Sequence, residues 1–508
     1  MDAILYWNDV ALEANRVSHT NGKEEQTGPT LSARALAIVH LAMYDAFVGA
    51  DNVGLSPANL DPYLTSPAIP APPPGTSPDT AVAAGAYWTL HHLFSSQRPF
   101  FDLIYDAVYS PVGLPAAGAH DGHVYGKKVA ERILGVRQGD PGAGSVGYTP
   151  QNGRGKHRPD PDNPTQGFHG PFFGVAKLFA ATNRHKLDAP PNVMTGAGEY
   201  RRALRQVRNK GIAPELAGTV PFASRRTAEE TVIGLYWAYD GAVGLGTPPR
   251  LYNQIVREVA QHTPNPHNGG GVNTPAQNAR LFALVNAAMG DAAILGWEQK
   301  YRFEYWRPVL GIREHDPSLG PSGVPDDDIN PDSDPGWLPL GSPNTNTSRK
   351  NFTPPFPAYP SGHATFGAAA FHITRRFYKV AKNDKNPDPL FNGQSFVSEE
   401  LNGVSRDNKG AVRPKHTRNF PKGLWQMILE NGFSRVFLGV HWVFDAFAVD
   451  SDGDPDFSRN IGGVPLGLAI ANDIFDDGLQ AANAAGPALT AMPDSMDATI
   501  PRRAWPQE

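Results

Sequence analysis

Residues 31–50 constrain the fold more than any other stretch, because apolar or small side chains occupy most of its positions. At 3.6 residues per turn, these side chains surround nearly the whole circumference of a helix. A helix that is apolar on all sides is stable when other elements cover it. The stretch therefore predicts a mostly buried helix, for which Ser32 is a candidate N-cap.

Most of the other periodic stretches also predict helices, and segments rich in proline and glycine separate them. The chain holds 49 prolines and 52 glycines but few of the alternating valine and isoleucine runs that are typical of strands. We therefore expect a mainly α fold with two helical bundles joined by long ordered loops. The further helices are predicted at 79–95, 99–110, 118–138, 196–209, 226–240, 249–262, 275–305, 362–380, 422–438, 441–448 and 465–478.

The clearest break in the chain is the segment 264–271, which consists mainly of Pro, Asn and Gly. A chain of 508 residues is long enough for two or three domains, or for one large domain. We place a boundary at this break, between an N-terminal helical half, 1–265, and a C-terminal helical bundle, 272–480. The polar residues 487–508 are expected to form a loose tail.

Charge and composition exclude several classes of function. A net charge of −5 offers no basic field, so neither nucleic acid nor a membrane is an expected partner. The absence of cysteine excludes disulfides, zinc–cysteine sites, iron–sulfur clusters and thiol nucleophiles. No window of 18 uncharged apolar residues predicts a membrane span, and the N-terminus does not resemble a signal peptide. If the protein is exported, it would use a route that needs no signal peptide. The sequence predicts neither the compartment nor the oligomeric state.

The first group of candidate site residues lies at 300–308. Lys300 and Arg307 are seven residues apart, which places both side chains on one face of a continuous helix. Pro308 disfavours helical conformation at Arg307, so the helix is expected to end there. A lysine beside a guanidinium can grip one anion from two directions. On its own, however, the pair is better explained as a solvated basic edge.

The second group lies at 354–363. Four prolines between positions 354 and 360 keep this segment extended. Ser361 is then a natural N-cap for the following helix, and Gly362 allows a ligand to approach the backbone. Free amides in the first turn of a helix bind anions, and His363 would lie within reach of the bound group. A capping serine followed by an incidental histidine is the common alternative.

The third group consists of Arg435 and His441. They are six residues apart, which on a continuous helix would put them on different faces. Gly439 is expected to break the helix, so that His441 begins a new short helix and turns towards Arg435. The ordinary alternative is an arginine at a helix end and a satisfied core histidine near Trp442.

The three groups together form a pattern that the ordinary alternatives do not explain: Lys-x6-Arg-Pro, Pro-Ser-Gly-His and Ser-Arg-x5-His, in this order. The pattern resembles the signature of the acid phosphatase and vanadium haloperoxidase superfamily, which has a helical-bundle fold. The flanking residues are similar to fungal-type vanadium chloroperoxidases over roughly residues 30–480. The matching stretches are 237–241, 246–250, 297–300, 303–308, 354–367, 398–403, 437–442 and 462–467.

The resemblance implies a vanadate cofactor held in the C-terminal bundle. It implies that His441 makes the only bond from the protein to vanadium, and that His363 is the acid–base group. Lys300 would also polarise the bound peroxide, and Asp240 would pair with Arg435 behind the site. The groups that would hydrogen-bond the vanadate oxygens are Lys300, Arg307, Ser361, the Gly362 amide and Arg435.

The resemblance also implies the reaction, in which hydrogen peroxide oxidises chloride, bromide or iodide to hypohalous acid, with or without a bound organic acceptor. Trp297 and Phe356 would border the halide site, and phenylalanine at 356 favours chloride oxidation, because bromide-restricted relatives often carry a polar or basic residue there. The alternative is a phosphatase with His441 as nucleophile and His363 as the acid for the leaving group. Trp297, Phe356 and the long 314–358 loop favour the haloperoxidase.

Overall fold

The computed structural model describes residues 2–65, 68–109, 118–193, 197–314 and 332–481; the tail expected at 487–508 lies outside them. In the described part the chain is mainly α-helical, as predicted. The α-helices are α1 Ala3–Ser18, α2 Gly28–Asp51, α3 Pro78–Leu93, α4 Arg98–Tyr109, α5 Ala119–Val136, α6 Ala197–Lys210, α7 Ala228–Tyr236, α8 Pro248–His262, α9 Pro275–Phe303, α10 Pro308–Glu314, α11 Gly362–Phe377, α12 Gly423–Phe437 and α13 Gly463–Asp477.

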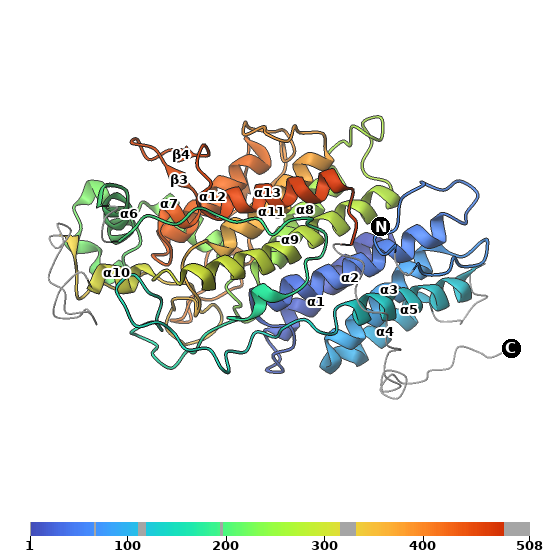
Figure 1. Cartoon of the computed structure of the whole chain (residues 1–508), viewed down its shortest axis with the longest axis horizontal. Helices are drawn as coiled ribbons and strands as arrows, with labels where there is room; N and C mark the ends of the chain where they lie inside the picture. Colours follow the sequence, from blue (N-terminus) through green and yellow to red (C-terminus); the bar gives the residue numbers. More distant parts are fainter. Residues whose placement is uncertain (1, 66–67, 110–117, 194–196, 315–331, 482–508) are drawn as a thin grey trace.

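The helices form two groups that α9 connects (Figure 1). In the N-terminal group, α2 packs against α3 and α5, and it also packs against α9. In the C-terminal group, α11 packs against α12 and α13, and it too packs against α9. One cluster of buried apolar side chains runs through both groups. The break at 264–271 falls between α8 and α9, and the domain boundaries drawn from it stay a prediction.

Two described helices, α2 and α9, are long and apolar enough to span a membrane. Their most apolar windows are 89% and 94% buried inside the protein. Burial of this extent is characteristic of core helices, because a helix in lipid presents apolar side chains outward. The prediction of a mostly buried helix at 31–50 is therefore confirmed by α2.

The predicted cap of α2 is wrong. Thr27 occupies the N-cap position, one turn before the expected one. Ser32 lies inside the helix, where its hydroxyl accepts a hydrogen bond from Asn15 Nδ2 at 2.8 Å and donates to Gln26 O at 3.0 Å. Ser32 thus ties α2 to α1, a helix that the sequence analysis did not predict.

The expectation that Lys300 and Arg307 share one helical face is also wrong. α9 ends at Phe303, because Glu304 adopts a left-handed conformation with a φ of 51°. Pro308 does not end a helix at Arg307 but begins α10, a second helix that was not predicted. Lys300 therefore lies in the last turn of α9, and Arg307 lies in the short segment between the two helices.

The N-terminal turn of α11 is supported by close packing against α13. Ser361 caps α11 as predicted, since its Oγ accepts a hydrogen bond from Ala364 N–H at 3.4 Å. A Cβ atom on Gly463 would lie 2.5 Å from Ser361 O, and one on Gly467 would lie 2.5 Å from Thr365 O. Only glycine therefore allows the backbones of these two helices to approach so closely.

The described strands are short and form two antiparallel pairs, β1 Ser395–Phe396 with β2 Arg418–Asn419, and β3 Ala448–Val449 with β4 Pro455–Asp456. Ser395 lies opposite Asn419, and Ala448 lies opposite Asp456. Gly439 prevents α12 from continuing, as predicted, because its φ is 76°. The helix predicted at 441–448 is wrong, because a three-residue 3-10 helix, η7 Val443–Asp445, leads directly into β3.

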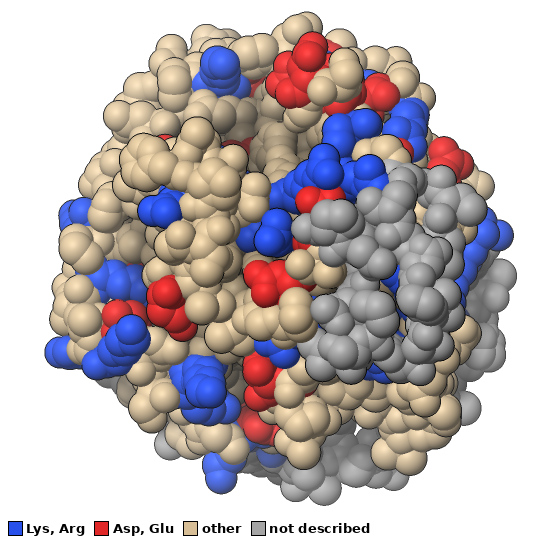
Figure 2. Space-filling view, turned by 90° about the vertical axis from the view of Figure 1, so that its left-hand side faces the viewer, with Lys and Arg blue, Asp and Glu red and all other residues tan. Residues whose placement is uncertain are grey.

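The end of the molecule where α6 and α10 lie carries a group of Lys and Arg side chains beside a hollow (Figure 2). The sequence of α6 includes five basic residues and one acidic residue. Some of these charges are paired: Arg205 binds Asp332 at 2.8 Å, and Lys210 binds Glu230 at 2.8 Å. The expectation that nucleic acid is not a partner stays a prediction.

Candidate active site

The three predicted cations come together although separate elements carry them. Lys300 lies on α9, Arg307 precedes α10 and Arg435 lies in the last turn of α12. Their exposed fractions are 0%, 1% and 0%, which is rare for cations. Burial, and then the charge of Arg307, lowers the pKa of Lys300 well below its usual value. Burial lowers the pKa of Arg307 to about 9, and Arg435 acts in the same direction.

Lys300 is held by three carbonyl groups of the extended segment before α11. Its Nζ donates to Pro357 O at 2.8 Å, to Ala358 O at 3.2 Å and to Pro360 O at 2.6 Å. Only the ammonium form has three N–H groups, so this geometry belongs to the charged side chain despite the lowered pKa. Lys300 therefore positions the segment 357–360, and it would have to exchange a carbonyl to bind a ligand.

Arg307 is only partly satisfied by the protein. Its Nε donates to Phe356 O at 2.9 Å, and its Nη1 donates to Val440 O at 2.7 Å and to His441 Nε2 at 2.9 Å. Its Nη2 is buried and has no hydrogen-bond partner among the described residues. A buried N–H group of this kind indicates a place for an acceptor that the protein does not supply.

Arg435 repeats this pattern. Its Nη2 donates to Asp240 Oδ1 at 2.9 Å, to Asp240 Oδ2 at 3.0 Å and to Ser342 Oγ at 3.1 Å. The expected pair between Asp240 and Arg435 is therefore present. Nε and Nη1 of Arg435 are buried, and the part of the chain that the structure describes gives them no partner. Arg435 thus offers two further donor nitrogens to an acceptor.

His441 is fixed in one tautomer by its two neighbours. Arg307 Nη1 donates to Nε2 at 2.9 Å, and the carboxylate of Asp445 accepts from Nδ1 at 2.7 Å. These contacts place the ring hydrogen on Nδ1 and the lone pair on Nε2. Burial, and then Arg307, lowers the pKa of His441 well below its usual value, so the ring is neutral. A neutral imidazole oriented by a carboxylate is the form in which histidine binds metal centres.

His363 lies in the first turn of α11, next to Gly362, which lines the same cavity. Its Nε2 lies 2.7 Å from Ala238 O and must donate, because a carbonyl oxygen can only accept. The lone pair of the neutral ring is then on Nδ1. Burial, and then the charge of Arg435, lowers the pKa of His363 to about 3. His363 is therefore neutral at neutral pH.

A cavity of about 250 Å³ opens on His363, Arg435 and His441 and has an apolar wall; Lys300 and Arg307 lie behind this wall and do not line the cavity. Trp297 and Phe356 lie in this wall with their ring centroids 4.9 Å apart. The ring of Phe356 also lies 4.9 Å from Lys300 Nζ and 5.0 Å from Arg307 Cζ. An apolar wall so close to two cations strengthens their attraction for an anion. The polar lining includes Asp240, His363, Arg435 and His441.

The donor set fits a tetrahedral oxyanion such as vanadate. Three buried donor nitrogens, Nη2 of Arg307 and Nε and Nη1 of Arg435, lack partners within the described ranges, and Nη1 of Arg307 contacts His441 Nε2. No group of three or more His, Asp or Glu side chains that could hold a metal cation occurs among the described residues. Positive donors with a single imidazole suit an anion that can also bond one nitrogen atom.

Comparisons with known proteins show the family of this chain. A family model described as "Vanadium chloroperoxidase N-terminal domain" matches residues 1–168, and one described as "VCPO second helical-bundle domain" matches residues 280–455. Vanadium chloroperoxidase of Curvularia inaequalis is 37% identical, and the match covers 94% of this chain and 90% of that protein. The chain belongs to the vanadium chloroperoxidase family. The resemblance inferred from the sequence motifs is thereby confirmed.

Solved structures show that the fold of this vanadium chloroperoxidase family member extends to distant proteins. A bacterial vanadium-dependent iodoperoxidase superimposes with a TM-score of 0.64 at 19% identity, covering 95% of this chain and 98% of that one. A holo-type bacterial vanadium-dependent chloroperoxidase gives 0.56 at 15% identity, covering 91% and 96%. At such low identity the likeness concerns the fold alone.

Sequence reasoning missed several residues that surround the site in this vanadium chloroperoxidase family member. Asp445 was not predicted, although a carboxylate four residues after a candidate ligand histidine is a usable signal. Ser342 lies in a long loop and carried no signal. His169 lines the cavity, with Thr30 Oγ1 2.9 Å from its Nε2, and only its place in the long segment between the predicted helices 118–138 and 196–209 set it apart.

Proposed function

We propose that this protein is a vanadate-dependent haloperoxidase that oxidises halide with hydrogen peroxide to hypohalous acid. The observation that carries the proposal is the set of buried, unpartnered N–H groups of Arg307 and Arg435 beside the neutral His441, within the described residues of a vanadium chloroperoxidase family member. When bound, vanadate supplies a Lewis acid that holds peroxide and makes its oxygen electrophilic towards halide. The residues that would hold it are Lys300, Arg307, Ser361, Gly362, Arg435 and His441.

The protein groups divide the remaining work. Nε2 of His441 would bond vanadium in place of the hydrogen bond that it accepts from Arg307, and the Asp445 carboxylate keeps that nitrogen free of its proton. The guanidinium groups of Arg307 and Arg435 would neutralise the charge of the oxyanion. Lys300 would polarise the bound peroxide after exchanging one of its three carbonyl contacts.

His363 would manage the protons of peroxide. Hydrogen peroxide must lose protons as it binds, and Nδ1 of His363 has a lone pair that can accept one. The pKa of His363, which is about 3, would rise beside a bound oxyanion, because negative charge opposes the effect of Arg435. The same residue can then return the proton as hypohalous acid leaves.

We further propose that chloride is a substrate alongside bromide and iodide. Phe356 forms an apolar wall next to Lys300 and Arg307, and burial beside an apolar ring removes water from a small halide. Replacing Phe356→His should lower chloride oxidation by at least roughly tenfold more than bromide oxidation. Steady-state rates with each halide test this, and an unchanged ratio of the two rates would remove Phe356 from the halide site.

The experiment that tests the function uses the apoprotein with orthovanadate, hydrogen peroxide and bromide, and follows bromination of a diketone dye. We expect turnover that depends on vanadate and is lost in His441→Ala. A matched control is His372→Ala, since His372 is another buried histidine but bonds Asn472 far from the site. Rapid hydrolysis of nitrophenyl phosphate without vanadate-dependent bromination would instead favour a phosphatase with His441 as nucleophile.

The oxidised halogen can leave the site as free hypohalous acid or react with an organic acceptor that is bound in the cavity. The cavity of about 250 Å³ has room beyond the oxyanion groups for a small organic acceptor. The function proposed above implies release of free hypohalous acid, and transfer to a bound acceptor is the alternative. Competition between two acceptors of different size, at equal chemical reactivity, should then give product ratios equal to those of added hypohalous acid; a different ratio would indicate a bound acceptor.

A further inference from the structure

The turn after α7, residues 238–240, touches the proposed oxyanion site from the N-terminal half of the chain. The carbonyl of Ala238 accepts the Nε2–H of His363 at 2.7 Å. The carboxylate of Asp240 accepts two hydrogen bonds from Arg435. Tyr239 lies between these residues, so its backbone conformation sets the direction of both contacts.

Tyr239 has a backbone conformation that a bulky residue rarely adopts. Its φ is 44°, in the left-handed region that favours glycine. The side chain is wholly buried, with 0% exposed. A residue stays in such a conformation only when its surroundings hold it there, and conformations of this kind are concentrated at functional sites.

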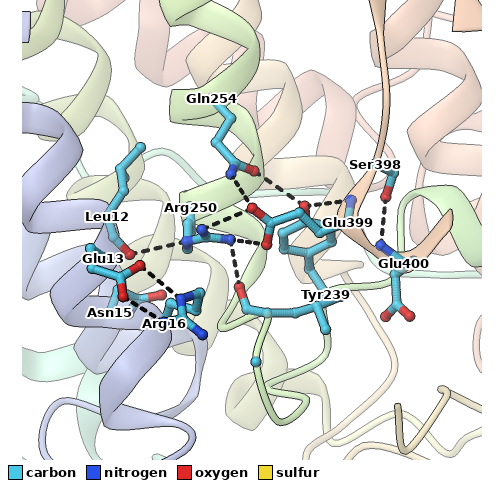
Figure 3. Close-up of polar contacts among 12 residues, drawn as sticks. Leu12, Glu13, Asn15, Arg16, Tyr239, Arg250, Gln254, Ser398, Glu399 and Glu400 are labelled. Carbon is cyan, nitrogen blue, oxygen red and sulfur yellow. Dashed lines mark hydrogen bonds and ion pairs between the residues drawn. The ribbon is translucent and has the colours of Figure 1, made fainter. Parts of the chain in front are cut away.

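The hydroxyl group of Tyr239 is held at two points. It donates to Gln254 Oε1 at 3.2 Å and accepts the backbone N–H of Glu399 at 3.0 Å (Figure 3). Gln254 Nε2 in turn donates to Glu399 Oε1 at 2.8 Å, which joins the two holding groups. The hydroxyl therefore links α8, which carries Gln254, to the 3-10 helix η6, Glu399–Leu401.

Arg250 fixes the position of Glu399, one of the two residues that bind the Tyr239 hydroxyl. Its Nη1 donates to Glu399 Oε2 at 2.5 Å, and its Nη2 donates to Glu399 Oε1 at 3.0 Å (Figure 3). Arg250 Nε also donates to Leu12 O at 3.0 Å, and Nη1 donates to Leu245 O at 3.0 Å. A two-point arginine–carboxylate pair with further backbone contacts resists displacement.

We propose that Tyr239 is a positioning residue of the oxyanion site, whose hydroxyl, held by Gln254 and Glu399, keeps the turn 238–240 in the conformation that orients His363 and Arg435. This inference rests on the proposed function of that site. Without the hydroxyl, the turn can relax to a negative φ. The Ala238 carbonyl and the Asp240 carboxylate would then rotate away from their partners.

The test compares Tyr239→Phe with the matched control Tyr236→Phe. Tyr236 is also 0% exposed and lies in the same segment, but its hydroxyl has no hydrogen-bond partner among the described residues. Vanadate affinity is measured by equilibrium dialysis, and kcat and KM are measured with bromide. In Tyr239→Phe we expect a vanadate Kd roughly tenfold weaker and a kcat roughly tenfold lower. The bromide KM should stay within about twofold of the unmodified protein, because the halide wall is untouched.

Tyr236→Phe should change each of these quantities by less than about twofold. Equal losses in the two variants, or no loss in Tyr239→Phe, would overturn the inference. If Tyr239→Phe does not fold, Gln254→Met takes its place, and normal vanadate affinity and kcat in that variant would overturn the inference too. Dialysis needs no peroxide, so weaker vanadate binding in Tyr239→Phe supports the inference even if the unmodified protein shows no bromination, which would contradict only the proposed function.

Discussion

At the scale of single residues, the pair formed by His441 and Asp445 decides which nitrogen can bond vanadium. The carboxylate accepts from Nδ1 at 2.7 Å, and Asp445 also accepts the backbone N–H of Trp442 at 3.0 Å. The carbonyl of Asp445 accepts the N–H of Ser361 at 2.7 Å, so the same residue fixes the start of α11. One aspartate therefore aligns the proposed ligand with the proposed oxyanion groups.

Replacing Asp445→Asn should weaken vanadate binding by about 10- to 100-fold, because a neutral amide no longer favours the tautomer with an unprotonated Nε2. Isothermal titration calorimetry of the apoprotein with orthovanadate measures this. The matched control is Asp473→Asn, since Asp473 also binds a histidine, His185, at 2.8 Å but lies outside the site. An affinity as strong as that of the control would mean that Asp445 does not orient His441.

Much of the candidate site could be predicted at this scale from local patterns. Proline before Ser361 and glycine at 439 act through backbone geometry that extends only a few residues, so the cap of α11 and the break after α12 were predicted correctly. The contacts of Lys300 with three carbonyl groups could not be predicted, because they depend on how a segment 57 to 60 residues away folds back. The same holds for Ser342 beside Arg435.

At the scale of elements, the contact of α11 with α13 depends on two glycines. Replacing Gly467→Ala would place a Cβ atom 2.5 Å from Thr365 O and 2.7 Å from Ala368 Cβ. The free energy of unfolding should fall by about 1–3 kcal/mol, as is usual for overpacking. Urea unfolding measures the change.

The control for this prediction is Gly296→Ala on α9, where the nearest atom to a new Cβ lies 4.0 Å away. This variant should be stabilised by up to roughly 1 kcal/mol, because alanine favours the helix. If both variants unfold at the same urea concentration, close packing of α11 on α13 does not limit stability.

The contact of α1 with α2 leads to a dependence on pH. His40 on α2 donates Nδ1–H to Leu36 O at 2.7 Å and accepts from Asn8 Nδ2 at 2.8 Å, so it is neutral. Burial lowers the pKa of His40 to about 4. As the pH falls, His40 takes up a proton in the unfolded chain at a higher pH than in the folded protein. The contribution of neutral His40 to the free energy of unfolding is therefore complete above pH 6.5 and is lost as the pH falls towards 4.

The free energy of unfolding should therefore fall between these pH values by up to roughly 3 kcal/mol more in the unmodified protein than in His40→Gln. Other buried histidines contribute equally to both proteins and cancel in the difference. Urea unfolding at a series of pH values checks this. Parallel curves for the two proteins would show that His40 does not titrate on unfolding.

The helices that sequence analysis missed differ in how much the sequence shows of them. Asp9, Glu13 and Arg16 recur at helical spacing on one face of α1, and Trp7 is buried, so α1 carries an amphipathic pattern that was available in the sequence. α10 has only seven residues and follows directly after a break. Long apolar helices such as α2 and α9 need no tertiary information, whereas a short helix such as α10 does.

At the scale of the whole molecule, α9 belongs to the cores of both helical groups. A Cβ atom on Gly290 of α9 would lie 3.1 Å from Ala37 Cβ on α2, so the two helices are in close contact. Asp240 from the N-terminal half reaches Arg435 in the C-terminal half. The site therefore depends on both halves, although the proposed vanadate-binding residues come from one.

A fragment with residues 272–480 should accordingly bind vanadate at least roughly tenfold more weakly than the full chain and expose apolar surface. Adding a separately produced fragment with residues 1–265 should restore binding. Dialysis against vanadate and the fluorescence of an apolar dye measure both effects. The control is the full chain cut at 268 after folding; full affinity in the isolated fragment would show an independent C-terminal domain.

The buried, unpartnered N–H groups of Arg307 and Arg435 affect the stability of the apoprotein, before vanadate binds. Any tetrahedral oxyanion that pairs these groups lowers the free energy of the folded state by mass action. Phosphate has the same tetrahedral shape as vanadate and is also an anion. It would thus act as a placeholder that protects the newly folded chain from heat, and loading becomes an exchange of one oxyanion for another.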